Sequence, residues 1–299
     1  MRVLVAEDEP VSRHRLQASL QRWGYTVQMA CNGAEAIEVI GQPDSPRLIL
    51  LDRMMPQADG LEVCRTIRKA AAEPYVYIIL LTAQGQQREI IEGFEAGADD
   101  YITKPFDAEE LKARVRTGAR IVELQEQLIA AREQLRIQAT HDALTGLLNR
   151  AAFFETFEKE VSRARRQRAP LALIMADLDR FKEINDRYGH LTGDMVLREA
   201  ACRLRASLRA FDVIGRYGGE EFIVLAPGCA TSDAQALAER FRASICAPAF
   251  DVPAGPIHVT MSLGVAATSD MNESARLLSA ADEALYRAKD GGRNMVAVG

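Results

Sequence analysis

Strand–helix alternation fills the first third of this sequence and restricts its fold more than any other feature. Apolar runs of strand length recur along it, at residues 3–6, 27–30, 48–51, 76–81 and 101–102. The segments between them carry apolar residues at helical spacing, as Val11, Leu16 and Leu20 do. This pattern predicts a parallel sheet wrapped by helices over residues 1–106. In such sheets, functional groups gather at the carboxyl ends of the strands.

Polar residues stand at those strand ends. Glu7 and Asp8 follow the first strand, and Asp52 ends the third. Thr82 ends the fourth strand, and Lys104 follows the fifth. Clustered carboxylates repel one another unless a cation lies among them, and oxygen ligands suit Mg²⁺. Asp52 is then placed to attack a phosphoryl group while Mg²⁺ and Lys104 neutralise its oxygens.

The strand-end motifs AED, LLD with MMP, LLTA and DYITKPF resemble the receiver domain of two-component response regulators over about the first 115 residues. The resemblance implies a flavodoxin-like doubly wound sheet in which Asp52 is the phosphoacceptor. It implies one Mg²⁺ held with Glu7 and Asp8, and a histidine kinase or phosphotransfer protein as the phosphoryl donor. Thr82 and Tyr101 match the family's switch pair, and Lys104 matches its phosphate-binding lysine. The family often has Asp at the position of Glu7.

A long helical segment follows. Residues 107–140 contain no proline and one glycine, and apolar residues repeat there at 3,4 spacing: Ile121, Leu124, Leu128, Ala131 and Leu135. This seam predicts a coiled-coil stalk in a homodimer. The alternative is one amphipathic helix lying on its own domain. We therefore expect a receiver over 1–115, a helical linker over 116–140 and a second domain over 141–299.

The second domain mixes strands and helices in a different order. We expect strands at 171–175 and 259–267, a hairpin of 213–216 with 222–225, and helices at 191–210 and 274–289. Because these strands pair both locally and at long range, a mixed or antiparallel sheet is expected.

Acidic residues again mark strand ends. Asp177 ends an apolar strand, and Glu220 follows the turn glycines Gly218 and Gly219. Together the two carboxylates can bridge two divalent cations over a triphosphate, and the glycines let the backbone approach a ligand. Lys289 and Arg293 form a late cationic cluster suited to phosphates.

Two further polar residues suit guanine. A carboxylate such as Asp194 accepts both guanine donors, N1–H and N2–H₂, while Asn185 can serve N3, N2 or O6. Adenine would leave the carboxylate unpaired, a penalty on the order of 10³-fold. The pocket chemistry therefore favours GTP over ATP.

RYGGEEF at 216–222, with DALTGLLNR at 142–150 and ALYRAKDGGRN at 284–294, resembles the GGDEF family of diguanylate cyclases. The resemblance implies a palm-like fold that condenses two GTP into cyclic di-GMP. Several roles carry over by position: two Mg²⁺ ions on Asp177, Glu220 and the backbone of Leu178; phosphate contacts from Lys182, Lys289 and Arg293; and guanine contacts from Asn185 and Asp194. Glu220 is a candidate proton acceptor, and Glu221 has a less defined acidic role.

An Arg-x-x-Asp pattern precedes the glycine turn. Arg209 and Asp212 resemble the family's product-inhibition site, and Arg240 lies where some members carry a second arginine. Arginine clamps phosphates or stacks on guanine, and aspartate accepts from the guanine edge. Cyclic di-GMP is therefore expected as inhibitor as well as product.

Charge and hydropathy argue against two other classes of protein, DNA-binding proteins and membrane proteins. The formal net charge of −5 argues against non-specific DNA binding, as does the lack of a helix-turn-helix pattern after residue 115. No apolar run is long enough for a membrane span, and the acidic N-terminus is unlike a signal peptide, so a cytoplasmic location is expected. The alternative to a cyclase is a module that binds GTP or cyclic di-GMP and signals through a partner.

Overall fold

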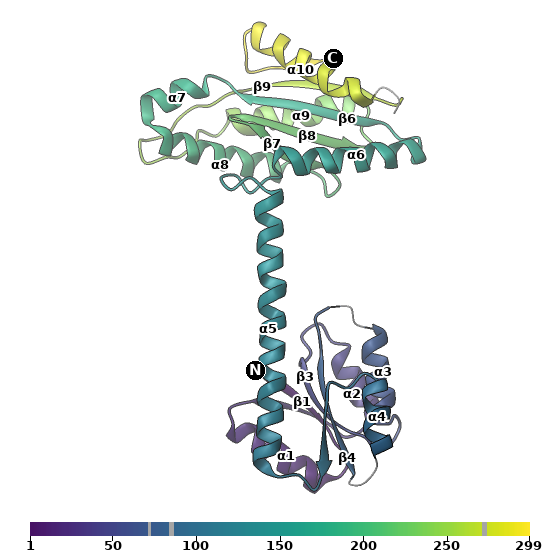
Figure 1. Ribbon diagram of the computed structural model, residues 1–299. Helices are drawn as coiled ribbons and strands as arrows, with labels where there is room; N and C mark the ends of the chain where they lie inside the picture. Colours follow the sequence, from purple (N-terminus) through teal and green to yellow (C-terminus); the bar gives the residue numbers. More distant parts are fainter. Residues whose placement is uncertain (71–72, 84–86, 271–273) are drawn as a thin grey trace. The chain divides into compact units, whose positions relative to one another are not determined.

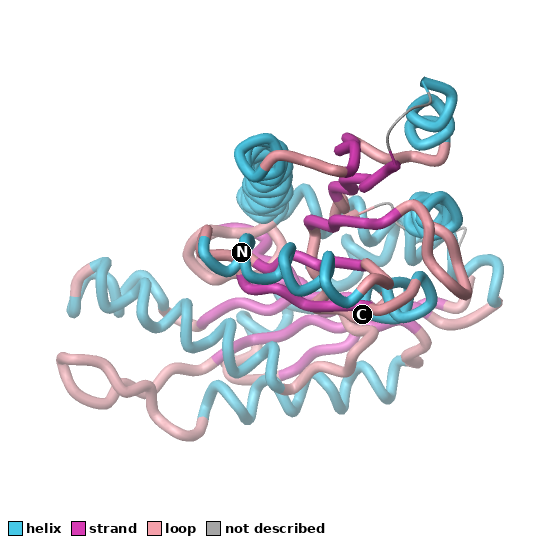
Figure 2. The backbone as a smooth tube through the Cα atoms, turned by 90° about the horizontal axis from the view of Figure 1, so that it is seen from below, coloured by secondary structure: helices cyan, strands magenta, loops and turns pink. Residues whose placement is uncertain are grey.

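The computed structural model describes residues 1–70, 73–83, 87–270 and 274–299. The chain divides into two compact units, Met1–Glu133 and Gln134–Gly299. Each unit contains a five-stranded sheet. Helices flank both sheets, as Figures 1 and 2 show. Within the described ranges, no helix combines the length and the apolarity that a membrane span requires.

The first unit contains a parallel sheet with the strand order β2-β1-β3-β4-β5. Its elements are β1 (Arg2–Ala6), α1 (Pro10–Arg22), β2 (Thr26–Ala30), α2 (Gly33–Ile40), β3 (Leu48–Asp52), α3 (Gly60–Ala70), β4 (Tyr77–Ala83), α4 (Gln87–Glu95), β5 (Asp100–Lys104) and α5 (Ala108–Thr140). Every residue of β3 is buried, as expected for a central parallel strand covered on both faces. The doubly wound sheet predicted from the sequence is confirmed.

Two apolar clusters lie on the two faces of this sheet. On one face, Leu16 of α1 and Leu111 of α5 pack in the same cluster. On the other face, Ala36 of α2 and Val63 of α3 do so. Because helices cover both faces, the carboxyl ends of the strands are the accessible edge of the sheet.

Helix α5 is continuous over 33 residues and changes its surroundings along its length. Val122 is buried, and Ile121, which the sequence assigns to the seam, packs against the core of the first unit. The later seam residues Leu124, Leu128 and Leu135 are 53%, 63% and 65% exposed. The solvent-facing part of the seam therefore begins at Leu124.

The second unit contains a mixed sheet with the strand order β10-β9-β6-β8-β7. Its elements are α6 (Arg150–Gln167), β6 (Leu171–Leu178), α7 (Phe181–Tyr188), α8 (His190–Ala206), β7 (Val213–Gly218), β8 (Glu221–Pro227), α9 (Thr231–Cys246), β9 (Met261–Thr268), α10 (Ser274–Asp290) and β10 (Val296–Val298). Neighbouring strands are antiparallel except β10, which runs parallel to β9. The mixed sheet expected from the sequence is confirmed.

The helix expected over 191–210 ends earlier in the structure. Helix α8 stops at Ala206, and Ser207 is its C-cap. A tight turn follows, in which the Arg209 backbone N–H donates to Asp212 Oδ2 at 2.9 Å. A short acidic side chain that satisfies a nearby backbone N–H competes with helix formation, which explains the earlier end.

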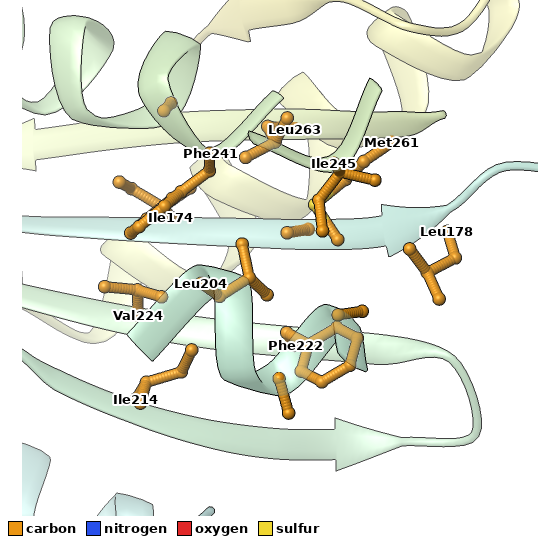
Figure 3. Packing of buried hydrophobic residues seen from close by; sticks show 14 of the residues in the cluster. Ile174, Leu178, Leu204, Ile214, Phe222, Val224, Phe241, Ile245, Met261 and Leu263 are labelled. Atoms are coloured by element: carbon orange, nitrogen blue, oxygen red, sulfur yellow. The ribbon is translucent and has the colours of Figure 1, made fainter. Parts of the chain in front are cut away.

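Strand β6 is the centre of the second unit's core. All eight of its residues are buried. Figure 3 shows Ile174 of this strand in one cluster with Leu204 of α8, Phe222 of β8 and Phe241 of α9. Contacts on both faces fix the strand tightly, so the position of the acidic residues at its end is fixed as well.

We expect Gly264→Ala to destabilise the second unit. A Cβ at Gly264 in β9 would lie 2.1 Å from the carbonyl oxygen of Ala281 and 2.2 Å from the backbone nitrogen of Leu285, both in α10. Because backbone atoms cannot rotate away, the helix has to shift, at about 1–3 kcal/mol. Calorimetry of the full chain should show the midpoint of this unit falling by roughly 3–10 °C.

Gly41→Ala is the matched control. Its φ is −68°, and its nearest neighbours to an added Cβ lie 3.5 Å away. Its effect should stay within about 1 kcal/mol. Equal midpoint losses for the two variants would contradict the assigned packing of α10 on β9.

Candidate active site and phosphoacceptor site

The first site is an acidic cluster at the carboxyl ends of β1 and β3. Each of Glu7, Asp8 and Asp52 has a carboxylate oxygen within 4.8 Å of the others'. Lys104, at the end of β5, places its Nζ 2.7 Å from Glu7 Oε2 and 2.9 Å from Asp52 Oδ2. Three carboxylates at this spacing fit a hard cation such as Mg²⁺, which prefers oxygen ligands.

The charges of this cluster are strongly linked. Burial raises the pKa of Glu7, the Lys104 bond lowers it, and the nearby Asp52 carboxylate raises it further, with a net rise. Burial alone would lower the pKa of Lys104, but its hydrogen bonds to Glu7 and Asp52 raise it overall. A divalent cation suits such a site because it neutralises the carboxylates, and a phosphoryl group suits it because Lys104 can pair with the added negative charge.

The two predicted switch residues lie close to this cluster. Thr82 on β4 is buried, and its hydroxyl has no hydrogen-bond partner among the described residues. Tyr101 on β5 is half-buried, edge-on to Phe94 with ring centroids 5.8 Å apart. Thr82 and Tyr101 line the same small hollow between β4, β5 and α4. Their switching role stays a prediction.

The second site lies where β6 meets the hairpin of β7 and β8. Asp177 of β6 pairs in register with Glu221 of β8. Gly218 pairs with Glu221, so Gly219 and Glu220 form the two-residue turn, with φ of +43° at Gly219. The Leu178 backbone N–H donates to the Glu220 carbonyl at 3.3 Å. This register sets a glycine turn and two glutamates beside Asp177, as the sequence predicts for this turn.

Asp177 is electrostatically unfavourable where it stands. It is 7% exposed. Burial raises its pKa, the Lys289 ammonium at 2.7 Å lowers it, and the charges of Glu220 and Glu221 raise it, to about 6 overall. A divalent cation would relieve this repulsion, and the donors available are oxygens. The residues present therefore fit the expected Mg²⁺.

The two guanine candidates lie on adjoining helices. Asn185 is on α7 and Asp194 is on α8, joined by a turn at Gly189 with φ of +84°. A Cβ at Gly193 would lie 1.9 Å from Asn185 Oδ1, so the amide packs directly against the residue before Asp194. The structure thus packs the Asn185 amide against the turn of α8 that carries Asp194, where glycine is needed for the close approach.

The three phosphate candidates are placed differently. Lys289 near the end of α10 already contacts Asp177. Lys182 on α7 and Arg293 in the loop after α10 are exposed. Their approach to a triphosphate stays a prediction.

Comparison with known families decides the identity of the second unit. The sequence model for "Diguanylate cyclase, GGDEF domain" matches residues 139–295, and the model for "Response regulator receiver domain" matches residues 3–116. The chain belongs to the GGDEF family. Its first unit is a response regulator receiver domain.

Relatives share one or both parts. "Response regulator PleD" of Caulobacter vibrioides is 33% identical over 298 residues, covering 99% of this chain and 65% of its own length. This chain therefore spans just under two thirds of that relative. "Diguanylate cyclase DgcP" of Pseudomonas aeruginosa is 45% identical over 166 residues, or 56% of this chain and 25% of its own.

Solved structures resemble the C-terminal part. The coiled coil and GGDEF domain of DgcB from Caulobacter crescentus, in complex with c-di-GMP, matches with a TM-score of 0.57 and 32% identity, covering 63% of this chain and 99% of that one. SiaD from Pseudomonas aeruginosa, in complex with its activator SiaC, matches with a TM-score of 0.53 and 34% identity, covering 64% and 74%.

The candidate product site of the GGDEF domain is gathered around a cysteine. Arg209 and Asp212 close one turn, and Arg209 Nη1 lies 3.6 Å from Cys229 Sγ. Arg240 of α9 donates to the Ser207 carbonyl at 3.4 Å. Burial raises the pKa of the Cys229 thiol, and the charges of Arg209, Asp212 and Arg240 also act on it. The structure therefore brings the three predicted residues together.

An ion pair between Arg216 and Asp142 lies beside the GGDEF turn, and the sequence did not predict it. Arg216 Nη1 lies 3.1 and 3.0 Å from the two oxygens of Asp142, and its Nε and Nη2 donate to the Gly219 carbonyl at 2.9 and 2.7 Å. Burial acts to raise the pKa of Asp142, but bonds from Thr145 and Arg216 lower it overall. The turn is thus bonded to the segment that follows α5. Arg216 stands two residues before the glycine pair, and an arginine so close to this turn was the available signal.

We expect the stability effect of Asp177→Asn to depend on pH. The folded pKa, about 6, lies above the ordinary 3.8. The carboxyl group therefore stabilises the folded domain fully below about pH 4, and this contribution is lost as the pH rises through about 6. Without metal at about pH 8, the neutral variant should be more stable by roughly 1–3 kcal/mol, and near pH 4 the two should be equal.

Thermal unfolding in a chelator, across this pH range, measures the effect. The exposed Asp251→Asn is the control and should change little at any pH. A gain for Asp177→Asn that stays constant with pH would contradict the raised pKa.

Proposed function

We propose that this chain is a diguanylate cyclase that condenses two GTP molecules into cyclic di-GMP and two pyrophosphates. One observation carries the proposal: the buried Asp177, with a pKa of about 6, lies beside two glutamates of the glycine turn and the ammonium of Lys289. Such a group of acids with a lysine suits a metal-bound triphosphate. The adjoining Asn185 and Asp194 supply donors and acceptors that complement guanine.

Each residue has a task in this reaction. Mg²⁺ held by Asp177, Glu220 and the backbone of Leu178 would supply charge neutralisation at the phosphates and acidify the attacking hydroxyl. Lys182, Lys289 and Arg293 bind and orient the phosphate oxygens. Glu220 accepts the proton of the 3′-hydroxyl.

The 3′-oxygen of one GTP forms a bond to the α-phosphorus of the other, and the bond from that phosphorus to the bridging oxygen of the leaving pyrophosphate breaks. A second, identical attack in the opposite direction closes the ring. Because one domain holds one GTP, two domains must face each other.

The exposed leucines of α5 support a homodimer. Leu124, Leu128 and Leu135 stand at the four- and seven-residue intervals of a coiled-coil seam and are more than half exposed. A second copy of this helix would bury them.

Phosphorylation of Asp52 is the proposed input. The phosphoryl group comes from a histidine kinase or a phosphotransfer protein and bonds with Lys104. The hydroxyl of Thr82, which has no hydrogen-bond partner in the part of the chain that the structure describes, turns toward it, and Tyr101 moves into the space released. Because α5 packs on the receiver core through Leu111 and continues to Thr140, a change in receiver packing reaches the stalk.

Incubation with GTP and Mg²⁺, followed by nucleotide chromatography, tests the activity. We expect cyclic di-GMP from the wild type, more of it after treatment with acetyl phosphate, and no response to acetyl phosphate in Asp52→Asn. Glu220→Gln should lower turnover at least about 100-fold because it removes a metal ligand. The exposed Glu155→Gln on α6 is the matched control. Tight GTP binding without product would instead indicate a binding module.

We also propose that cyclic di-GMP inhibits the enzyme at Arg209, Asp212 and Arg240. Arg209→Ala should leave turnover intact and raise the inhibitory concentration of cyclic di-GMP by about 10–100-fold, because charge-assisted bonds are lost. The exposed Arg205→Ala, one helical turn earlier, should leave inhibition unchanged. Inhibition assays with added product measure both variants, and equal inhibition of the two would refute the site.

A further inference from the structure

A second buried carboxylate lies two residues after Asp177 and faces another set of partners. Asp179 is 6% exposed. Its Oδ1 accepts from Ser262 Oγ at 2.6 Å, and its Oδ2 accepts from Thr260 Oγ1 at 2.7 Å and from the backbone N–H of Asn294 at 3.0 Å. Three donors from two distant segments therefore occupy both oxygens.

These bonds argue against a metal-ligand role for Asp179. A carboxylate that already accepts one hydroxyl on Oδ1, and one hydroxyl and one amide on Oδ2, has little capacity left for a cation. Its own backbone N–H also donates to the Thr260 carbonyl at 2.9 Å, which fixes the orientation. The two aspartates on either side of Leu178 thus differ in role, with Asp177 at the candidate metal site and Asp179 at a structural junction.

The segment that Asp179 holds has an unusual backbone. Gly292, Arg293 and Asn294 follow α10 with φ values of +120°, +65° and +47°. Two consecutive non-glycine residues in the left-handed region are unfavourable and persist only when their surroundings hold them. The Asp179 bond to Asn294 is one such anchor, and Arg242 Nη1 of α9 bonds to Asn294 Oδ1 at 3.0 Å as another.

This anchored loop carries a phosphate candidate. Arg293 directly precedes Asn294, and Lys289 lies five residues before it, at the end of α10. Lys289 is bonded to Asp177, while Asn294 is bonded to Asp179. The end of β6 therefore fixes the C-terminal cationic segment at two points.

We propose that Asp179 is a positioning residue that holds the turn at 291–294, so that Lys289 and Arg293 face the triphosphate. It acts through the backbone of Asn294 and does not touch the nucleotide. This inference rests on the proposed function, because that function supplies the triphosphate.

The main test compares two ligands. 3′-Deoxy-GTP lacks the attacking hydroxyl and cannot react, and guanosine lacks phosphates. In Asp179→Ala we expect the affinity for 3′-deoxy-GTP, measured by calorimetry with Mg²⁺, to fall about 10–100-fold, as for the loss of charge-assisted phosphate bonds. The affinity for guanosine, followed by NMR, should change less than about threefold.

A second readout needs no nucleotide. Hydrogen exchange at the Asn294 amide should speed up at least about tenfold in Asp179→Ala, because its acceptor is gone. Asp179→Asn is the conservative rescue. Its amide oxygen can still accept from Asn294, while its NH₂ donates to the Ser262 hydroxyl, so both affinities should stay close to wild type.

The double variant Thr260→Val, Ser262→Ala separates loop anchoring from general stability. It removes two hydroxyl donors but leaves the Asn294 bond, so the preference for the triphosphate should remain. Should Asp179→Ala fail to fold, Arg242→Met removes the other anchor of Asn294. This variant should lower the affinity for 3′-deoxy-GTP by about 3–10-fold and leave the affinity for guanosine unchanged.

Two results would overturn the inference. One is a variant Asp179→Ala whose affinity for 3′-deoxy-GTP and whose hydrogen exchange at the Asn294 amide both equal those of the wild type. If that variant does not fold, the same result in Arg242→Met has the same meaning. The other is an equal loss for both ligands, which indicates a purely structural role. A wild-type protein that binds 3′-deoxy-GTP no better than guanosine would refute the proposed function and, with it, the phosphate role of the loop.

Discussion

Repulsion between closely spaced carboxylates is the constraint on which both sites of this protein depend. In the receiver, Glu7, Asp8 and Asp52 meet at one sheet edge, and in the GGDEF domain Asp177 meets Glu220 and Glu221. Each group has one lysine bonded to it, Lys104 in the first and Lys289 in the second. Acids held together against repulsion cost stability, and such a cost is typical of sites that bind cations or phosphates.

Two different sheet topologies produce these similar groups. In the receiver, parallel strands end at the same edge, so residues 45 positions apart, such as Glu7 and Asp52, become neighbours. In the GGDEF domain, the antiparallel pairing of β6 with β8 sets Asp177 opposite Glu221, and a two-residue turn adds Glu220. The buried strands β3 and β6 give each group a rigid support.

The sequence predicted what local pattern and motif determine. The doubly wound receiver, the mixed second sheet and the family follow from strand periodicity and from the glycine–acid turn. Contacts between residues that are distant in the sequence could not be predicted from it. Asp179 stands only two residues from Asp177 in the sequence, but it bonds to Thr260, Ser262 and Asn294 in the folded chain. Ile121 fits the seam, yet the receiver core covers it.

Two further features, the end of α8 and the ion pair of Arg216 with Asp142, also depend on contacts that sequence patterns do not show. Residues 207–210 have helical propensity, but the Asp212 side chain caps the Arg209 amide and turns the chain. Arg216 and Asp142 are 74 residues apart, and although the position of Arg216 beside the glycine turn drew attention to it, its partner could not be identified from the sequence. Propensity decides such segments only where no tertiary partner competes.

The short exposed seam of α5 has a consequence for the proposed homodimer. From Leu124 to Leu135 it covers only about 18 Å of helix, near two heptads. Isolated coiled coils of that length associate weakly. Pairing through this helix alone would therefore track the concentration of the chain, and the amount of chain present would adjust its proposed output alongside any covalent signal.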